Sequence, residues 1–191
     1  MNLKKPQRPF FSNYLRKKRI QAIKPYLKGN ILDLGCGRTL IPHLLKQDQI
    51  YIGIDQNPEV LKRIREKYPN IDFQQKNLET DEISVYQLFD TVLLLAVIEH
   101  LENPHNILCQ ISKFLTQNGN LIITTPSPLG GKIHALGSDL HLFSKRAVED
   151  HKHFYSMKYL ATFIQYYGLK QVHRKFFLLG GNQLFVFQKN N

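Results

Sequence analysis

The chain has 191 residues, of which 42% are hydrophobic and 21% are charged, and its formal net charge is +11 at pH 7. The longest apolar run, Val92 to Ile98, excludes a membrane-spanning helix, which requires about 20 residues. No apolar stretch follows the basic residues at the start of the chain, so we expect no secretory signal. We expect one globular domain with a cytoplasmic location.

The two cysteines, Cys36 and Cys109, have neither the paired spacing of a zinc site nor the density of a disulfide framework. We interpret both as small reduced residues. Cys36 is expected to fill tight space beside a ligand.

The basic residues gather at the two ends of the chain. All fifteen Asp and Glu residues lie between Asp33 and Asp150, whereas residues 1–28 carry nine Lys or Arg and residues 151–191 carry six. Such ends can bind an anionic partner, or they can form a solvated basic surface without one. Both interpretations stay open.

The first expected element is a helix that begins at Phe11 and ends at Pro25. Residues 1–10 contain two prolines and are typical of a loose arm, so residues 1–28 are expected to form a basic arm and a capping helix. The helix carries a basic cluster, Arg16 to Arg19. We favour a helix that caps the sheet over one that binds phosphate, because no groove with interleaved aromatic residues is evident.

A strand, a glycine turn and a helix are expected next. Ile31 to Leu34 is typical of a buried strand, Gly35-Cys36-Gly37 ends it, and Leu40 to Leu45 has a helical pattern. Glycine lets the backbone approach a ligand, because it has no Cβ and accepts positive φ. A second strand, Tyr51 to Ile54, ends in Asp55, whose carboxylate can accept two hydrogen bonds from a ribose diol.

Helices and strands alternate through the rest of the chain. The expected helices are 58–67, 81–88, 103–115 and 157–167. The expected strands are 71–75, 90–95, 121–125, 169–178 and 183–188, of which the last two form an antiparallel hairpin. Residues 127–155 are expected to form a partly helical lid that binds the substrate.

Asp33 distinguishes between classes of nucleotide. A dinucleotide-binding turn needs a third glycine, but Thr39 stands at that place. An acidic residue two positions before the turn would repel a pyrophosphate, which binds at the helix N-terminus that follows. The same carboxylate suits a nucleoside that carries a cationic ammonium group.

These residues resemble the class I S-adenosylmethionine-dependent methyltransferases, whose first motif is a strand that ends in Asp-Leu-Gly-Cys-Gly. The similarity continues through a ribose-binding motif, an adenine-contacting turn and the fourth and fifth strand segments. The corresponding residues here are Asp55-Gln56, Asn77-Leu78, 89–101 and 115–126. With these four segments following the first motif in order, the signal is specific, and the resemblance covers about residues 20–190.

The resemblance implies a Rossmann-like α/β fold, with a seven-stranded sheet whose last strand is antiparallel and helices on both faces. It implies a single domain over residues 1–191 and S-adenosylmethionine as cofactor. The cofactor-binding residues that it implies are Asp33, Gly35, Cys36, Gly37, Asp55, Gln56, Asn77, Leu78, Leu95 and Ala96. For Asn77 a plain capping role is equally open.

Methyl transfer from a sulfonium needs no acid, but an oxygen acceptor must lose a proton, and histidine suits that step near neutral pH. The candidates are His100, His141, His151 and His153. We predict that His100 or His153 is the base.

The order Glu99-His100 followed by His151 and His153 is similar to the metal-dependent small-RNA 2′-O-methyltransferases. Ala96 stands where that family has its first glutamate, so no metal is expected. The same residues are also similar to small-molecule O-methyltransferases, including those of quinone biosynthesis, which need no metal there.

We therefore expect a methyltransferase that modifies an oxygen of a small molecule, and an anionic one fits the basic ends. The alternatives are an RNA 2′-O-methyltransferase and a non-catalytic protein of this fold that binds nucleic acid. A nicotinamide oxidoreductase is disfavoured by Thr39. Nitrogen and carbon acceptors and the oligomeric state stay open.

Overall fold

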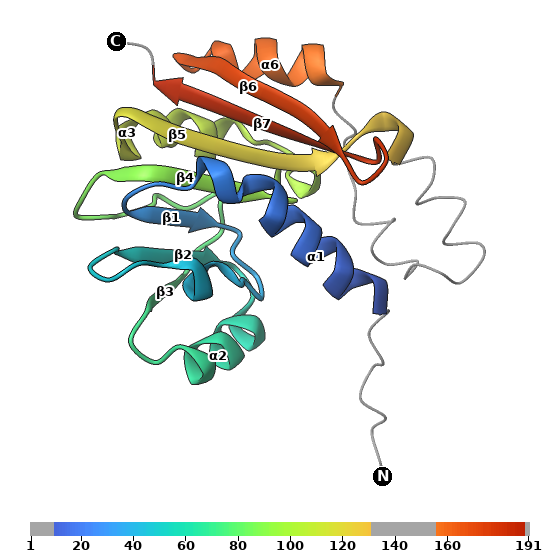
Figure 1. Ribbon diagram of the computed structural model, residues 1–191. Coiled ribbons are helices and arrows are strands. Elements are labelled where there is room, and N and C mark those ends of the chain that lie inside the picture. Colours follow the sequence, from blue (N-terminus) through green and yellow to red (C-terminus); the bar gives the residue numbers. More distant parts are fainter. Residues whose placement is uncertain (1–9, 131–155, 190–191) are drawn as a thin grey trace.

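A computed structural model describes residues 10–130 and 156–189. Its centre is a seven-stranded sheet with the strand order β3-β2-β1-β4-β5-β7-β6 (Figure 1). The strands are β1 (Ile31–Leu34), β2 (Tyr51–Asp55), β3 (Asp72–Gln75), β4 (Phe89–Leu95), β5 (Leu115–Pro126), β6 (Leu169–Phe177) and β7 (Asn182–Lys189). The first five are parallel, and β7 is antiparallel to both β5 and β6. The predicted fold class is confirmed.

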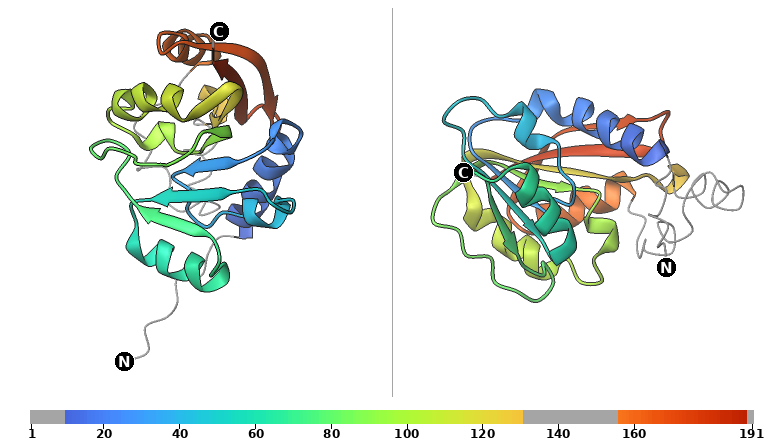
Figure 2. Two further views of the ribbon diagram at one scale, coloured as in Figure 1. Left: turned by 90° about the vertical axis from the view of Figure 1, so that its left-hand side faces the viewer. Right: turned by 90° about the horizontal axis from the view of Figure 1, so that it is seen from below.

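Helices cover both faces of this sheet (Figure 2). They are α1 (Phe10–Ile23), α2 (Pro58–Lys67), α3 (His105–Phe114) and α6 (Met157–Gln165), with short 3-10 helices η1 (Lys24–Tyr26), η2 (Ile41–Leu44) and η3 (Ile98–His100). No helix among the described residues is long and apolar enough to cross a membrane.

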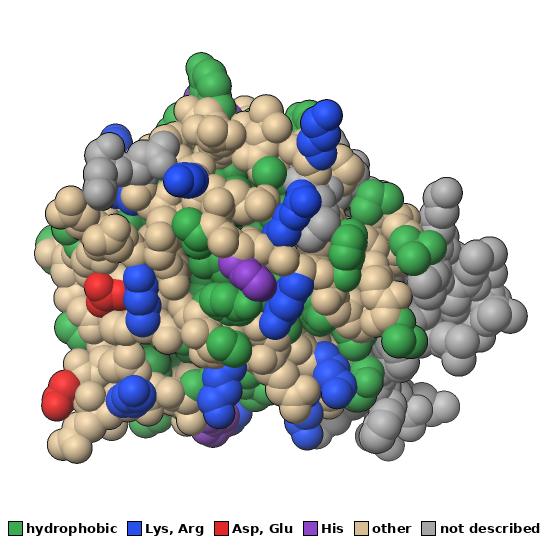
Figure 3. Space-filling model, turned by 45° about the horizontal axis from the view of Figure 1, so that its top comes forward, with side chains coloured by type: hydrophobic (Ala, Val, Ile, Leu, Met, Phe, Trp, Pro, Cys, Tyr) green, Lys and Arg blue, Asp and Glu red, His purple; other side chains and the backbone are tan. Residues whose placement is uncertain are grey.

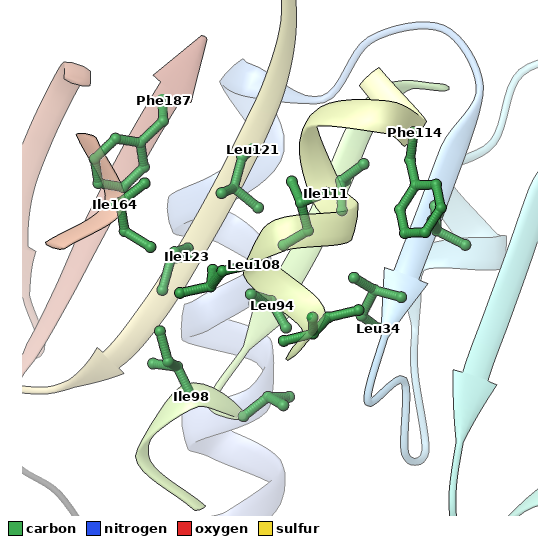
Figure 4. Close-up of a cluster of buried hydrophobic side chains, with 14 of the residues drawn as sticks. Leu34, Leu94, Ile98, Leu108, Ile111, Phe114, Leu121, Ile123, Ile164 and Phe187 are labelled. Carbon is green, nitrogen blue, oxygen red and sulfur yellow. The ribbon is translucent and has the colours of Figure 1, made fainter. Parts of the chain in front are cut away.

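Each face of the sheet has its own apolar core. On one face α3 and α6 pack against β4, β5 and β7 through side chains such as Leu108, Ile164 and Phe187 (Figure 4). On the other face α1 and α2 contribute Ile23, Leu61 and Ile64. Burial of one such side chain stabilises the fold by about 1.5–3 kcal/mol. The sheet is thereby held between two layers, and its carboxyl edge is left for a site.

The helix predicted over Leu40 to Leu45 is wrong, because only η2 forms there. Pro42 lies in the first turn of η2, where its missing N–H is tolerated, and Leu45 already has extended backbone angles. The chain must return to the start of β2, where the carbonyl of Ile50 accepts a 2.8 Å hydrogen bond from Ile31. A single turn fits that short path.

The helix predicted over residues 81–88 is also wrong, since this segment is irregular. The Ile83 side chain is buried, whereas that of Tyr86 is fully exposed. The Ile83 N–H donates a 2.9 Å hydrogen bond to the side chain of Gln110 on α3 rather than to a helical carbonyl. Tertiary contacts outweigh the weak tendency of a short segment to form a helix.

Strand β5 begins at Leu115, directly after α3, rather than at residue 121. Leu115 pairs with Phe89 of β4, and the register shifts before Asn120. Asn118, with a φ of +63°, allows the strand to bend there. The other predicted bounds within the described residues agree within two residues. The predicted arm and most of the predicted lid lie outside the described residues.

Candidate active site

The glycine turn after β1 lies at the carboxyl edge of the sheet. The backbone N–H groups of Gly35 and Cys36 both donate 2.8 Å hydrogen bonds to the carbonyl of Ile54. Gly35 has a φ of +73°, and a Cβ there would lie 2.5 Å from Cγ2 of Val97. Gly37 has a φ of +53°, but a Cβ there would meet no atom closer than 4.0 Å. Gly35 therefore permits close packing, and the backbone at Gly37 faces space that a ligand can enter.

Asp55 joins the end of β2 to this turn. Its Oδ2 accepts a 2.8 Å hydrogen bond from the N–H of Gly37, and its Oδ1 accepts one of 2.9 Å from the N–H of Asn57. Each carboxylate oxygen has a second lone pair. Asp55 is thus fixed in place and still able to accept hydrogen bonds from a diol.

A hollow of about 240 Å³, which we call the first hollow, lies beside Asp55. The predicted site residues that line it are Gly35, Asp55, Gln56, Asn77, Leu78, Ala96 and His100. Its other lining residues, which were not predicted, are Lys76, Glu79, Val97 and Leu101. They follow the ends of β1, β2, β3 and β4, where ligands bind in open α/β sheets.

Asn77 caps the following turn and also lines the first hollow, so both roles that its sequence context left open stay possible. Its side-chain oxygen accepts a 2.9 Å hydrogen bond from the N–H of Glu79, and the same residue lines the first hollow. This bond uses the side-chain oxygen and leaves the amide NH₂ group as a donor for a ligand. Leu78 beside it is buried and supplies an apolar surface.

A second hollow, of about 220 Å³, adjoins the first at Gly35 and Ala96, which line both. The predicted residues that line it are Asp33, Gly35, Cys36, Gly37, Leu95 and Ala96. The others are Arg16, Arg19 and Ile20 of α1, and Arg38, Thr39 and Leu40 after the turn. The second hollow therefore brings one buried aspartate together with three arginine residues.

Asp33 is only 2% exposed, and the hydroxyl of Tyr51 donates a 2.7 Å hydrogen bond to its Oδ2. Burial raises the pKa of this carboxyl to about 6, although the hydrogen bonds from Tyr51 and Thr39 act in the opposite direction. Burial, together with the charges of Asp33 and Asp55, also raises the pKa of the Cys36 thiol. The raised pKa disfavours the thiolate form that a nucleophile requires.

Ala96 lies at the junction of the two hollows and lines both of them. It has a φ of +57°, which is uncommon for a residue with a Cβ, and its N–H donates a 2.8 Å hydrogen bond to the carbonyl of Thr124. Such strained positions concentrate at ligand sites. The conformation turns the chain sharply at the end of β4, so that Leu95 and Val97 line different hollows.

The sequence predicted α1 as a cap and did not predict that its arginines reach the site. α1 packs on the sheet through Ile23, which agrees with the cap, but Arg16 and Arg19 also line the second hollow. The basic cluster was the available signal. Its helical spacing puts Arg16 and Arg19 on one side, and Lys17 lies on the exposed side.

Of the histidines predicted as bases, His100 lines the first hollow and His153 lies outside the described residues. His141 and His151 lie outside them as well. Within residues 10–130 and 156–189, no three His, Cys, Asp or Glu residues are grouped so that they could hold a metal ion.

The face that carries α1 and the β6–β7 hairpin is basic. Figure 3 shows Lys and Arg side chains spread over this face, with acidic side chains only near its margin. Within it Tyr26 stacks on His173, with ring centroids 4.9 Å apart, and the Lys175 ammonium lies 5.5 Å from the Tyr26 ring centre. The Lys and Arg residues that the sequence concentrates near its two ends thus contribute to one basic surface of the folded protein.

Comparison with known proteins shows the family to which the chain belongs. The profile of a family described as "Methyltransferase domain" matches residues 28–172. The ubiquinone biosynthesis O-methyltransferase of Glaesserella parasuis serovar 5 is 30% identical over 104 residues, which are 50% of this chain and 44% of that protein. The putative methyltransferase 235L of Invertebrate iridescent virus 6 is 26% identical over 96 residues, which are 49% of this chain and 36% of that protein. The chain thus spans less than half the length of these relatives.

Solved structures share the fold across the whole sheet. The putative methyltransferase in a complex with the Haloferax volcanii Trm112 activator has a TM-score of 0.72 at 14% identity, and the match covers 95% of this chain and 93% of that one. The N-methyltransferase NodS of Bradyrhizobium japonicum, in complex with S-adenosylhomocysteine, has a TM-score of 0.64 at 16% identity over 97% of this chain and 90% of that one.

A sheet of this order, with five parallel strands and two hollows that meet at a glycine turn on their carboxyl edge, is typical of nucleoside-binding α/β proteins. The chain belongs to the methyltransferase domain family, and its fold is that of the class I S-adenosylmethionine-dependent methyltransferases. The resemblance found in the sequence is confirmed.

Proposed function

We propose that this protein transfers the methyl group of S-adenosylmethionine to an oxygen atom of a small molecule. The observation that carries the proposal is the pair of hollows that meet at Gly35 and Ala96. Each hollow alone is smaller than the roughly 300–1,000 Å³ of ordinary ligand pockets, but together they reach that range. A ligand with two chemically different halves fits such a pair.

The first hollow suits an adenosyl group. Asp55 offers free lone pairs to the ribose hydroxyls, and Asn77 offers an amide NH₂ group to the adenine edge. Leu78 supplies an apolar surface for the ring, and Gln56 lies at the rim. Each good hydrogen bond to a charged group contributes about 1.5–3 kcal/mol.

The second hollow suits the methionine part. Asp33 pairs with a cationic ammonium group, while Arg16 and Arg19 can pair with a carboxylate. The open space at Gly37 lets the backbone come close to the ligand. Cys36 and Leu95 form part of the wall of the second hollow. When bound, S-adenosylmethionine supplies the methyl group. The protein's own task is then to orient the acceptor and to remove its proton.

An oxygen acceptor on a small molecule is supported by two observations. Curated relatives with 30% identity over half of this chain are named O-methyltransferases. Arg38 also lines the second hollow and adds positive charge beside the methionine part, which favours an acceptor that carries an acidic group. His100 and His153 stay our candidates for the base on the sequence argument.

Calorimetry tests the cofactor assignment. We expect S-adenosylmethionine and S-adenosylhomocysteine to bind, and NAD to bind at least about 100-fold more weakly, which corresponds to about 2.8 kcal/mol. Tight binding of NAD alone would overturn the assignment.

Labelled S-adenosylmethionine tests the acceptor. Incubation with a panel of phenols and catechols, and separately with RNA, is followed by mass spectrometry of the products. We expect O-methylated small molecules. Methylation of RNA 2′-hydroxyls, with binding that weakens steeply as salt rises, would instead assign the basic face of α1 and β6 to an RNA substrate.

A further inference from the structure

Glu79 lines the first hollow but was neither predicted as a site residue nor assigned a contact with the cofactor. It lies in the turn that follows β3. Its Oε1 accepts two hydrogen bonds from backbone N–H groups, one of 2.7 Å from Glu102 and one of 2.8 Å from Asn103. Hydrogen bonds to an ionised acceptor are shorter and stronger than those between neutral groups. A side chain from the turn after β3 thus holds the loop between η3 and α3.

The loop that Glu79 holds forms one wall of the first hollow. His100, at the end of η3, and Leu101 directly after it both line this hollow. The His100 N–H donates a 2.9 Å hydrogen bond to the carbonyl of Val97, within the turn of η3. The two N–H groups that bind Glu79 belong to the residues that follow Leu101. The wall is therefore held by η3 on one side and by Glu79 on the other.

The opposite wall is connected to the same residue. The side-chain oxygen of Asn77, the proposed contact for adenine, accepts a 2.9 Å hydrogen bond from the backbone N–H of Glu79. The N–H of Asn77 in turn donates a 2.9 Å hydrogen bond to Oδ2 of Asp81, which closes the turn after β3. A continuous series of hydrogen bonds therefore runs from the Asn77 side chain through Glu79 to the backbone beyond Leu101.

Asn106 on α3 makes a second connection between the same two segments. Its Nδ2 donates hydrogen bonds of 3.1 Å and 3.2 Å to the carbonyls of Leu78 and Asp81. These bonds hold α3 against the turn after β3 and do not involve the Glu79 carboxylate. Removal of that carboxylate should therefore release the loop locally and leave α3 in place.

We propose that Glu79 is a positioning residue of the cofactor site, which holds His100 and Leu101 against the adenosyl half. This inference rests on the proposed function. Glu79 acts on the reaction through the loop, because the loop carries His100, a candidate for the base. A displacement of about 1 Å at such a group can reduce the rate by about 10²-fold.

Hydrogen exchange tests the position of the loop without a ligand. In Glu79→Ala we expect the amides of Glu102 and Asn103 to exchange at least about tenfold faster than in the wild type, while those of β4 stay unchanged. In Glu79→Gln the side-chain carbonyl oxygen can still accept both N–H groups, so exchange should stay within about threefold of the wild type. Unchanged exchange in Glu79→Ala would overturn the inference.

Calorimetry measures the consequence for the cofactor. We expect the dissociation constant of S-adenosylhomocysteine to rise by about 5–20-fold in Glu79→Ala and by less than about twofold in Glu79→Gln. Adenosine should lose the same factor, because the proposed function places it in the first hollow alone. Weak binding by Glu79→Gln, with Glu102 and Asn103 still protected, would mean that the carboxylate contacts the ligand directly, and the positioning role would be overturned.

The variant Asp90→Ala is the matched control. Asp90 also joins separate segments, since its Oδ2 accepts a 2.9 Å hydrogen bond from the N–H of Asn30 and its Oδ1 accepts one of 3.0 Å from the Thr116 hydroxyl. It lies near the start of β4, at the edge of the sheet opposite to the hollows. This variant should melt at a lower temperature but bind S-adenosylhomocysteine within about twofold of the wild type. Equal loss of affinity in Asp90→Ala and Glu79→Ala would attribute the effect to general destabilisation and overturn the inference.

The inference and the proposed function fail in different experiments. A wild-type protein that binds neither S-adenosylhomocysteine nor adenosine would refute the proposed function, and the exchange rates would then decide alone whether Glu79 holds the loop. A wild-type protein that binds both ligands, with Glu79→Ala binding them equally well, would refute the inference and leave the proposed function intact.

Discussion

The Oδ2 of Asp55 lies 2.8 Å from the backbone nitrogen of Gly37 and accepts its hydrogen bond. These residues belong to the two motifs that we expected to bind the cofactor together. The bond joins the end of β2 to the turn after β1, so the two halves of the site are fixed relative to each other before a ligand arrives. Preorganisation of this kind reduces the entropy lost on binding.

The substitution Asp55→Asn tests this coupling. An amide has only one acceptor oxygen, so it cannot hold Gly37 and Asn57 and also receive both ribose hydroxyls. We expect the dissociation constant of S-adenosylhomocysteine to rise by about 10–100-fold, or about 1.4–2.8 kcal/mol, in calorimetry. Asp72→Asn, on the exposed side of β3, is the control and should bind as the wild type does.

The pH dependence of cofactor binding tests the role of Asp33. A cationic ammonium group binds the ionised carboxylate, and the pKa of this carboxyl in the free protein is raised to about 6. The affinity for S-adenosylmethionine should therefore be constant between about pH 6 and pH 8, where the carboxylate is ionised and the ammonium group still carries its proton, and fall by up to about tenfold per unit below pH 6. Asp33→Asn should bind more weakly at pH 8 and lose this dependence.

5′-Methylthioadenosine, which lacks the ammonium group, provides the ligand control. Its affinity should not follow the ionisation of Asp33. A pH profile that is the same for both ligands would show that Asp33 does not contact the ammonium. The stability of the free protein offers a second check, because a raised pKa makes stability fall as pH rises between about 4 and 6. Asp33→Asn should flatten that part of the curve.

The fold could be predicted because its signals are local. Ile31 to Leu34 and Tyr51 to Ile54 are short, mostly apolar runs with clear ends, and the Asn57 side chain caps α2 by accepting hydrogen bonds from the N–H groups of Glu59 and Val60. Glycines and an aspartate at fixed spacing then located the first hollow. Such features depend on neighbours in the chain and are visible before folding.

The second hollow could be predicted only in part. Asp33 and Leu95 belong to motifs, but Arg16 and Arg19 reach the site because of the direction in which α1 crosses the sheet. That direction is set by packing between residues distant in sequence, and no local pattern encodes it.

Ala96 allows a paired test of the junction between the hollows. Its φ of +57° costs an L residue about 1 kcal/mol, which glycine avoids. We expect Ala96→Gly to bind S-adenosylhomocysteine within about threefold of the wild type, because the backbone is kept. Ala96→Val should weaken binding by at least about tenfold, since two added methyl groups enter the space shared by both hollows. Equal binding by both variants would show that the ligand does not cross this junction.

Gly35 and Val97 provide the last test, which concerns the turn itself. A Cβ on Gly35 would lie 2.5 Å from Cγ2 and 3.0 Å from Cγ1 of Val97, at a φ of +73°. We expect Gly35→Ala to lower the free energy of unfolding by about 2–4 kcal/mol, through backbone strain and overpacking together. Urea unfolding measures this loss.

A double-mutant cycle separates the two causes. Val97→Ala removes both methyl groups that the new Cβ would meet, but it leaves the φ of Gly35 unchanged. The double variant should therefore be more stable than the sum of the single losses predicts, by about 1–2 kcal/mol, with the strain of the positive φ remaining. Strict additivity would mean that the clash contributes nothing and that Gly35 is required for its backbone angle alone.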